Sequence, residues 1–188
     1  ALLIGGAVYA QDLVVKIGHV GPTSGSIAHL GKDNEMGARL AIDELNAKGV
    51  MIGGKKAKFE LLAEDDAADP KQGAAVAQKL ADAQVQGVIG HLNSGTTIPA
   101  SSVMDVAAGR DIKLVPVNDE IVGAMKKINP GYTKGTIKAG TYPKQDKDVQ
   151  VIGFFTHIVA SCKLPADMVY AMTKTIANNT KTLATVAK

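Results

Sequence analysis

Short apolar runs alternate with amphipathic stretches over the first 109 residues of the chain. Three runs rich in β-branched residues predict buried strands, at residues 13–20, 57–63 and 86–90. Apolar residues at helical spacing follow each run and predict helices over residues 31–48, from 70 onward and over 98–109. This β-α-β-α-β-α order predicts a parallel sheet with right-handed crossovers and helices on both faces.

The first two predicted helices carry clear end signals. Gly49 is a natural C-cap of the first helix. The second begins with Asp69 as N-cap, Pro70 at the first position and Gln72 at the capping-box position. Each helix has an apolar stripe that we expect to be buried: Met36, Leu40, Ala41 and Leu45 in the first, and Val76, Ala77, Leu80 and Ala81 in the second.

The pattern after residue 109 is less regular. Residues 112–117 predict a fourth strand, and Asp119 is expected to cap a helix over 120–129. Residues 130–148 are rich in Gly, Lys and Thr, and a loop of this length is usually functional or disordered. Residues 149–158 predict a fifth strand, parallel or antiparallel to the others.

A final helix is expected from about Pro165, with four apolar residues on one face: Met168, Val169, Met172 and Ile176. The predicted fold class is therefore α/β, with a three-layer, doubly wound, mainly parallel sheet of about five strands. The 188 residues, 46% hydrophobic and 21% charged, fit one soluble globular domain. Aromatic residues are only 4%, so the core must be aliphatic, which favours helices packed on a sheet.

Residues 1–10, ALLIGGAVYA, are apolar and end in small residues. This pattern predicts the remnant of a secretory signal peptide, and hence export to the periplasm. A first β-strand or a tag remnant is the alternative. No other run is long enough to cross a membrane.

Charge and cysteine usage exclude several kinds of function. The net charge is +3, with 10 basic and 12 acidic residues in 1–110 and 11 basic and 6 acidic in 111–188. The lysines of the basic half are scattered without interleaved aromatics, so nucleic-acid binding is not expected. Cys162 is the single cysteine and the four histidines lack ligand spacing, so we expect neither a metal nor another cofactor.

A polar turn follows the third predicted strand in the stretch GVIGHLNSGTTIPAS, residues 87–101. Strand, polar turn and helix start together form the usual ligand position at the carboxyl edge of a parallel sheet, where N–H groups and hydroxyls receive a carboxylate. The candidate ligand-binding residues are Asn93, Ser94, Gly95, Thr96 and Thr97, with Ser24 in the loop after the first strand. The alternative is that Ser94 and Thr96 simply cap the third helix.

The ordered segments VVKIGHVGPTSGSIAHLGKDNEMGARLAIDELNAKG, GGKKAKFELLAEDDAADPKQ, AVAQKLAD, GVIGHLNSGTT and IPAS resemble the periplasmic leucine/isoleucine/valine-binding proteins of bacterial ABC importers. The resemblance extends to about residue 103. It implies a two-lobed receptor that closes over an amino acid, with Ser94 receiving the ligand carboxylate. It also implies a transporter permease as partner.

Three features depart from that family. Some relatives have a cysteine pair where this chain has Ala68 and Asn93, and an aromatic residue near the ligand where it has Leu30. The strand after residue 109 is expected to end in a Pro-Ala-Ala-Thr-like segment. Here Pro116 matches but the threonine is missing.

From about Gly109 onward, GRDIKLVPVNDEIVGAMKKINPGYTKGTIKAGTYPKQDKDVQVIG and SCKLPADMVYAMTKTI resemble the carboxyl-terminal part of TAXI-type receptors of TRAP transporters. Some of these are associated with glutamate-like or dicarboxylate ligands. The two resemblances predict a single lobe over residues 11–188, with a junction between its 11–108 and 109–188 halves. An engineered chimera, a natural recombinant and an incorrectly joined sequence are the three explanations, and the first is favoured.

The predicted function is therefore the binding of a small amino acid or organic acid without chemistry. No nucleophile lies near a base in sequence, and no dinucleotide glycine fingerprint is present. The acidic run of Glu64, Asp65 and Asp66 is expected to be a solvated loop with one capping acid rather than a metal or phosphoryl site. Two alternatives remain open: a folded scaffold without ligand binding, and a TRAP-type receptor.

Overall fold

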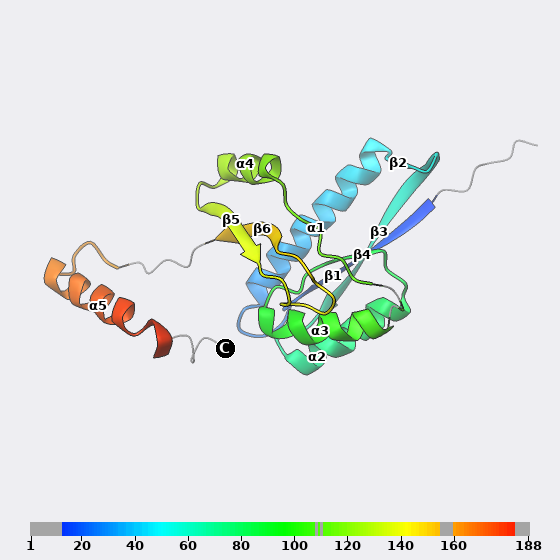
Figure 1. Ribbon diagram of the computed structural model, residues 1–188. Helices are drawn as coiled ribbons and strands as arrows, with labels where there is room; N and C mark the ends of the chain where they lie inside the picture. Colours follow the sequence, from blue (N-terminus) through cyan, green and yellow to red (C-terminus); the bar gives the residue numbers. More distant parts are fainter. Residues whose placement is uncertain (1–12, 108, 110, 155–159, 183–188) are drawn as a thin grey trace, which may run out of the picture. The chain divides into compact units, whose positions relative to one another are not determined.

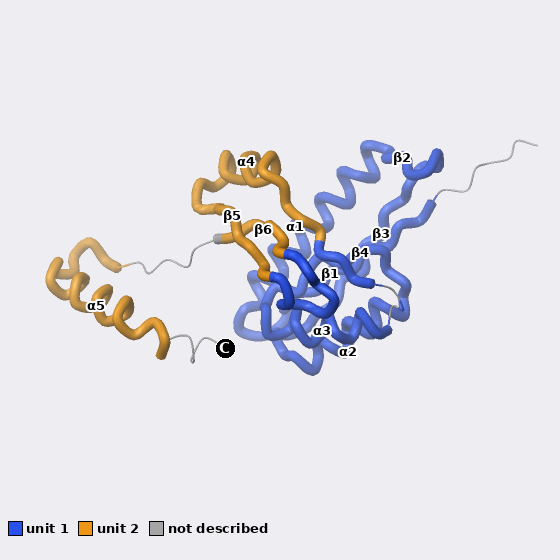
Figure 2. Tube along the Cα trace, viewed as in Figure 1, with its two compact units in different colours: residues 1–114, 139–147 blue, residues 115–138, 148–188 orange. Residues whose placement is uncertain are grey.

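A computed structural model describes residues 13–107, 109, 111–154 and 160–182. The predicted signal remnant, residues 1–10, lies outside the described residues. The chain divides into two compact units (Figure 2), the first built from residues 1–114 and 139–147 and the second from residues 115–138 and 148–188. Each unit is described separately.

The first unit is a layered α/β structure (Figure 1). Its elements are β1 (Leu13–Gly21), α1 (Ala28–Lys48), β2 (Met51–Ile52), β3 (Lys55–Asp65), α2 (Pro70–Asp82), β4 (Gly87–Ile89) and α3 (Ser94–Ala107). The sheet has the strand order β2-β3-β1-β4. Strand β1 pairs in parallel with β3 and with β4, and β2 forms a short antiparallel pair with β3. The predicted α/β class with a mainly parallel sheet is confirmed, although this sheet has four strands rather than about five.

Alternate residues of β1 face different helices, because successive side chains of a strand point to opposite faces of the sheet. On one face, Val20 packs in the core with Val76 and Leu80 of α2. On the other face, Gly21 lies against Gly31 of α1, since a Cβ on Gly21 would come within 3.5 Å of the Gly31 Cα. Helices therefore cover both faces, as the β-α-β alternation predicts.

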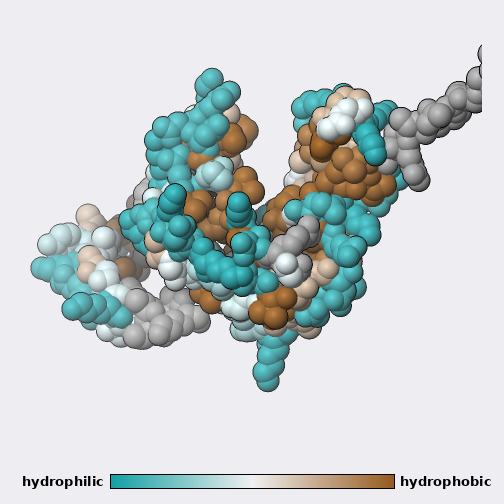
Figure 3. Space-filling view, turned by 45° about the vertical axis from the view of Figure 1, so that its right-hand side comes forward, coloured by the Kyte–Doolittle hydropathy of each residue, from teal (hydrophilic) through white to brown (hydrophobic). Residues whose placement is uncertain are grey.

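The predicted apolar stripe of α1 is wrong. Met36 and Leu40 are 68% and 61% exposed and Ala41 is also exposed, whereas Leu45 is half-buried. The buried face consists instead of Gly31, Ala38 and Ile42. A side chain at Gly31 would collide with the Pro22 carbonyl, so the close approach at this glycine sets the rotation of the helix, which apolar spacing alone does not show. Figure 3 shows that apolar side chains reach the surface over more than one element.

Both predicted helix ends are confirmed. Gly49 adopts the left-handed conformation at the end of α1, with φ 64° and ψ 50°. Asp69 caps α2 by accepting hydrogen bonds from the backbone N–H groups of Lys71 and Gln72. The Gln72 side chain, however, donates to the Asp65 carbonyl rather than completing a capping box. The predicted stripe of α2 is buried except for Ala81, which is half-buried.

The second unit contains α4 (Asp119–Ile128), β5 (Tyr132–Ile137), β6 (Val149–Phe154) and α5 (Ala166–Asn178). Strands β5 and β6 form a separate antiparallel pair. The predicted fifth strand, seen here as β6, is therefore antiparallel to β5 and does not belong to the four-stranded sheet. The segment expected to be a long loop thus contains a strand. Along this strand, half-buried Thr133, Gly135 and Ile137 alternate with exposed Lys134 and Thr136, which is the period of two expected of a strand.

The predicted strand at residues 112–117 is absent, and Val115 is 84% exposed. Pro116 has no backbone N–H to donate to a neighbouring strand, and Val117 contributes a single N–H to the Gln150 carbonyl. The cap of α4 is Asn118, whose side chain accepts from the Ile121 N–H, and not Asp119 as predicted. Asp119 instead pairs with Lys134 at 2.7 Å.

Helix α5 begins after Pro165 as predicted, but none of its described residues is buried. Met168 and Met172 of the expected apolar face are about half exposed, at 49% and 46%. Among the described residues, no helix combines the length and apolar character required to span a bilayer.

Two substitutions in α1 test which face of this helix is buried. We expect Ile42→Ala to lower the free energy of unfolding by about 2–5 kcal/mol, because the Ile42 side chain is enclosed. Leu40→Ala, the matched control on the exposed face, should change it by less than about 0.5 kcal/mol. Urea unfolding measures both, and an equal loss in the two variants would contradict the assigned face.

Candidate functional site

The carboxyl ends of β1, β3 and β4 lie at one edge of the sheet. Gly21 at the end of β1 pairs with Asp65 at the end of β3, and His19 pairs with Ile89 at the end of β4. The loops that follow these strands, residues 22–27, 66–69 and 90–93, therefore meet at this edge, which we call the carboxyl edge. Ligands bind at this position in open α/β sheets.

Asp65 holds the loop after β1. Its Oδ1 accepts hydrogen bonds from the backbone N–H groups of Thr23 at 2.8 Å, Ser24 at 3.3 Å and Ala67 at 2.8 Å. Burial by itself raises the pKa of Asp65, but hydrogen bonds from the Ser24 hydroxyl and these N–H groups outweigh it and hold the pKa below the usual 3.8. Asp65 is thus the capping acid expected in the acidic run.

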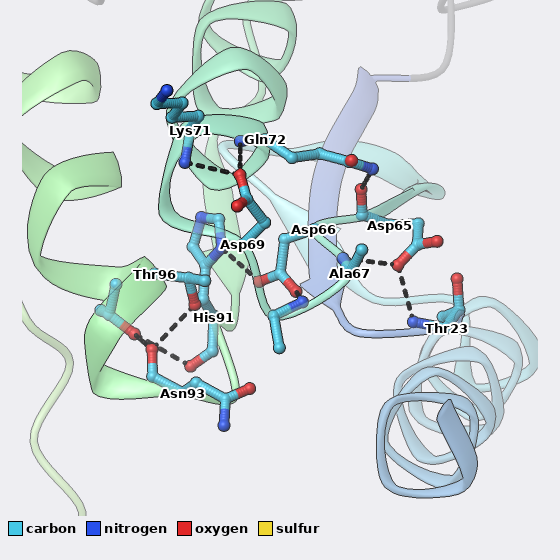
Figure 4. Close-up of polar contacts among 12 residues, drawn as sticks. Thr23, Asp65, Asp66, Ala67, Asp69, Lys71, Gln72, His91, Asn93 and Thr96 are labelled. Carbon is cyan, nitrogen blue, oxygen red and sulfur yellow. Dashed lines mark hydrogen bonds and ion pairs between the residues drawn. The ribbon is translucent and has the colours of Figure 1, made fainter. Parts of the chain in front are cut away.

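Asp66 departs from the prediction of a solvated loop, because its side chain is fully buried. Asp66 Oδ2 lies 2.8 Å from His91 Nδ1, and the His91 side chain is only 3% exposed (Figure 4). Asp66 Oδ1 accepts a hydrogen bond from the Ala68 N–H at 2.9 Å. A buried carboxylate with both oxygens hydrogen-bonded is a stable arrangement, whereas an unpaired one is costly.

His19 is a second buried histidine close to this edge, 1% exposed. Neither of its ring nitrogens has a hydrogen-bond partner among the described residues. Burial lowers the pKa of His19, the Glu35 carboxylate of α1 opposes this effect and Arg39 reinforces it. His19 is therefore a neutral side chain at neutral pH.

The turn between β4 and α3, residues 90–97, which we call the β4–α3 turn, is organised by the Asn93 carbonyl. This oxygen accepts hydrogen bonds from the backbone N–H groups of Thr96 at 3.1 Å and Thr97 at 2.9 Å, and from both threonine hydroxyls at 2.8 Å (Figure 4 shows the Thr96 side chain). The Thr97 hydroxyl also lies 3.2 Å from the His91 carbonyl. Both hydroxyls are thus donors within the turn, which differs from the capping alternative, because an N-cap side chain accepts from a backbone N–H.

Like Gly90, Ser94 and Gly95 are exposed residues of the β4–α3 turn. Ser94 and Gly95 are the first two residues of α3, and the first N–H groups of a helix have no partner within the helix. The positive end of the helix dipole adds to the attraction for an anion. A carboxylate can therefore approach the Ser94 hydroxyl and the N–H groups of Ser94 and Gly95.

The structure groups five of the six predicted ligand-binding residues on this one turn: Asn93, Ser94, Gly95, Thr96 and Thr97. Thr96 is 1% exposed and packs against Gly73 of α2, and the Asn93 Oδ1 atom is buried without a hydrogen-bond partner among the described residues. Ser24 lies on the loop after β1, exposed and tied to Asp65. Leu30, at the start of α1, is 45% exposed.

Sequence analysis missed the buried polar residues behind the turn: His19, Asp66 and His91. Each stands at the end of an apolar strand or directly after it, and this shared position was the available signal. His91 is hydrogen-bonded through Nδ1, whereas its Nε2 has no partner among the described residues. No group of three His, Cys, Asp or Glu side chains in the described part of the chain is arranged to hold a metal ion.

Comparison with known proteins identifies the family. A sequence profile described as the NMT1-like family matches residues 39–188, which is more than half of the chain. The chain belongs to the NMT1-like family. Part of this NMT1-like chain is also similar to curated amino-acid-binding proteins, which confirms the resemblance to the leucine/isoleucine/valine-binding proteins.

The leucine-specific-binding protein of Salmonella typhimurium is 44% identical over 105 residues, which cover 56% of this chain and 27% of that protein. The Leu/Ile/Val-binding protein of Escherichia coli K12 is 40% identical over 105 residues, with the same coverage. Among solved structures, the branched-chain amino acid transporter substrate-binding protein LivJ from Streptococcus pneumoniae, in complex with isoleucine, is 31% identical with a TM-score of 0.46. The similarity covers 59% of this chain and 31% of the LivJ chain. The chain spans about a quarter of the length of the curated relatives it matches.

The role of Asp65 is tested by the pH dependence of stability. Because folding lowers its pKa, the Asp65 carboxylate stabilises the protein above its ordinary pKa, and this contribution disappears as the pH falls through the lowered value. We expect the wild type to be more stable than Asp65→Asn at pH about 7, and the difference to shrink by pH about 3. Urea unfolding at both pH values measures it, with Asp146→Asn as an exposed control. A difference that does not change with pH would contradict the assignment.

Proposed function

We propose that this chain is a solute-binding lobe that recognises the carboxylate of a small amino acid, leucine, isoleucine or valine in the first instance, without altering it. One observation carries the proposal. The first turn of α3 exposes Ser94 and Gly95 at the carboxyl edge, and Ser94 occupies the position of the carboxylate-binding serine of the family it resembles. The printed names of the relatives, which refer to leucine, isoleucine and valine, support the ligand class.

Burial supports a binding role rather than catalysis at this edge. His19, Asp66 and His91 are capable of acid–base chemistry, but each side chain is at most 3% exposed. Asp65 and Asp69, also at this edge, accept hydrogen bonds from backbone N–H groups. A general acid or base must come within hydrogen-bond distance of its substrate. The first three are enclosed behind the turn and the other two hold backbone N–H groups, whereas Ser94 and Gly95 present a hydroxyl and helix N-terminal N–H groups to solvent.

The proposed setting is the periplasm, with an ABC-transporter permease as partner. The relatives and the apolar residues 1–10 support this setting. We further propose that residues 11–188 act as one lobe, with residues 11–108 carrying the ligand site. The match to the NMT1-like family includes both sides of residue 109, so a junction there rests on the two resemblances alone.

Affinity is expected to be low. Binding clefts usually bury most of a ligand's surface, and Ser94 and Gly95 face solvent. We therefore expect a Kd weaker than about 1 mM, which corresponds to less than about 4 kcal/mol. There are two other candidates: a scaffold without ligand binding, and a TRAP-type receptor for glutamate-like or dicarboxylate ligands. The NMT1-like match covers the carboxyl-terminal part of the chain, so the test includes glutamate.

Titration with leucine, valine and glutamate, followed by amide NMR, tests the proposal. We expect leucine at about 10 mM to shift the amide signals of Ser94 and Gly95 in the wild type, and Ser94→Ala to reduce these shifts severalfold. Ser102→Ala, an exposed serine of the same helix, is the control and should behave as the wild type. Shifts with glutamate alone would favour the TRAP-type receptor, and no shift with any ligand would refute retained binding.

A further inference from the structure

One buried contact joins two loops of the carboxyl edge. Asp66 belongs to the loop between β3 and α2, and His91 belongs to the β4–α3 turn. Asp66 Oδ2 lies 2.8 Å from His91 Nδ1, and among the described residues this is the single side-chain hydrogen bond between the two loops. Figure 4 shows the imidazole of His91 directed toward the Asp66 carboxylate.

His91 is also connected to the residues that face solvent. Its carbonyl lies 3.2 Å from the Thr97 hydroxyl, and two residues later the Asn93 carbonyl accepts the N–H groups of Thr96 and Thr97. Ser94 and Gly95 lie between these anchored positions. A fixed His91 ring therefore limits the directions in which the Ser94 and Gly95 N–H groups can point.

The contact is costly to break, because both partners are enclosed. Asp66 is fully buried, and its other oxygen already accepts the Ala68 N–H. Removing the imidazole donor leaves one carboxylate oxygen buried without a partner, which costs the desolvation of a charged group.

We propose that Asp66 and His91 are the positioning pair of the ligand site. They do not touch the ligand. They hold the β4–α3 turn so that the Ser94 and Gly95 N–H groups point outward before a carboxylate arrives, and such preorganisation removes part of the cost of binding. The expected effect on ligand affinity rests on the proposed function. The effect of Asp66 and His91 on the β4–α3 turn can be measured without a ligand.

The test compares His91→Asn with His91→Leu in the full chain. The Asn side-chain N–H lies near the position of the His Nδ1–H and still donates to Asp66, whereas Leu fills similar space without a donor. Hydrogen exchange at the Thr96 and Thr97 amides reports on the turn, and exchange at the Ala83 amide, bonded to the Lys79 carbonyl in α2, serves as the internal reference. His29→Leu, an exposed histidine, is the control variant.

We expect His91→Leu to accelerate exchange at Thr96 and Thr97 about tenfold or more, with Ala83 unchanged, and His91→Asn to stay within about threefold of the wild type. Leucine-induced shifts at Ser94 should fall with the Leu variant and persist with the Asn variant. Equal exchange in the wild type and His91→Leu, or an Asn variant as fast as the Leu variant, would overturn the positioning pair.

Should His91→Leu fail to fold, Asp66→Ala decides, because alanine offers no acceptor to the His91 Nδ1–H. This variant must accelerate Thr96 and Thr97 exchange more than Ala83 exchange, and equal acceleration at all three amides would overturn the inference. If the wild type shows no leucine shift at all, the proposed function fails, while the exchange measurements still decide whether Asp66 and His91 hold the turn.

Discussion

The carboxyl edge depends on the last residue of β3 and the residue after it. Asp65 binds the loop after β1 through the N–H groups of Thr23 and Ser24, and Asp66 binds the turn after β4 through His91. Because β1 lies between β3 and β4, these two consecutive acids connect loops on both sides of the central strand. The Asp66 N–H also donates to the Gly21 carbonyl at the end of β1. Two adjacent carboxylates thus organise all three loops of the carboxyl edge.

This arrangement separates residues that hold the site from residues that face solvent. Carboxylates and histidines at the edge are buried or hydrogen-bonded to the backbone, and the threonine hydroxyls donate to the Asn93 carbonyl. Ser94 and Gly95 are among the exposed residues and offer a hydroxyl and N–H groups at a helix N-terminus. Such groups suit an anion that is bound and released without chemistry.

Much of the first unit was predictable from the sequence, because local signals there agree with the tertiary structure. The strand periodicity, the Asp69 cap and the Gly49 cap all describe what the backbone does. The buried face of α1 was not predictable from apolar spacing, since a glycine contact with Pro22 sets it. In the second unit, the residues around Pro116 favour a strand, but Pro116 cannot donate to a neighbouring strand and none forms. The strand Tyr132–Ile137 was not predicted, because it has few apolar side chains. At the site, the position of Ser94 was predictable, but the Asp66–His91 contact joins residues 25 apart and required the strand register.

An isotope-edited NOE spectrum of labelled leucine with the full chain tests the central claim most directly, because it locates the ligand rather than its effects. The account predicts NOEs from the leucine α-proton to the amides of Ser94 and Gly95. NOEs confined to residues away from the β4–α3 turn, under conditions where leucine is bound, would contradict it.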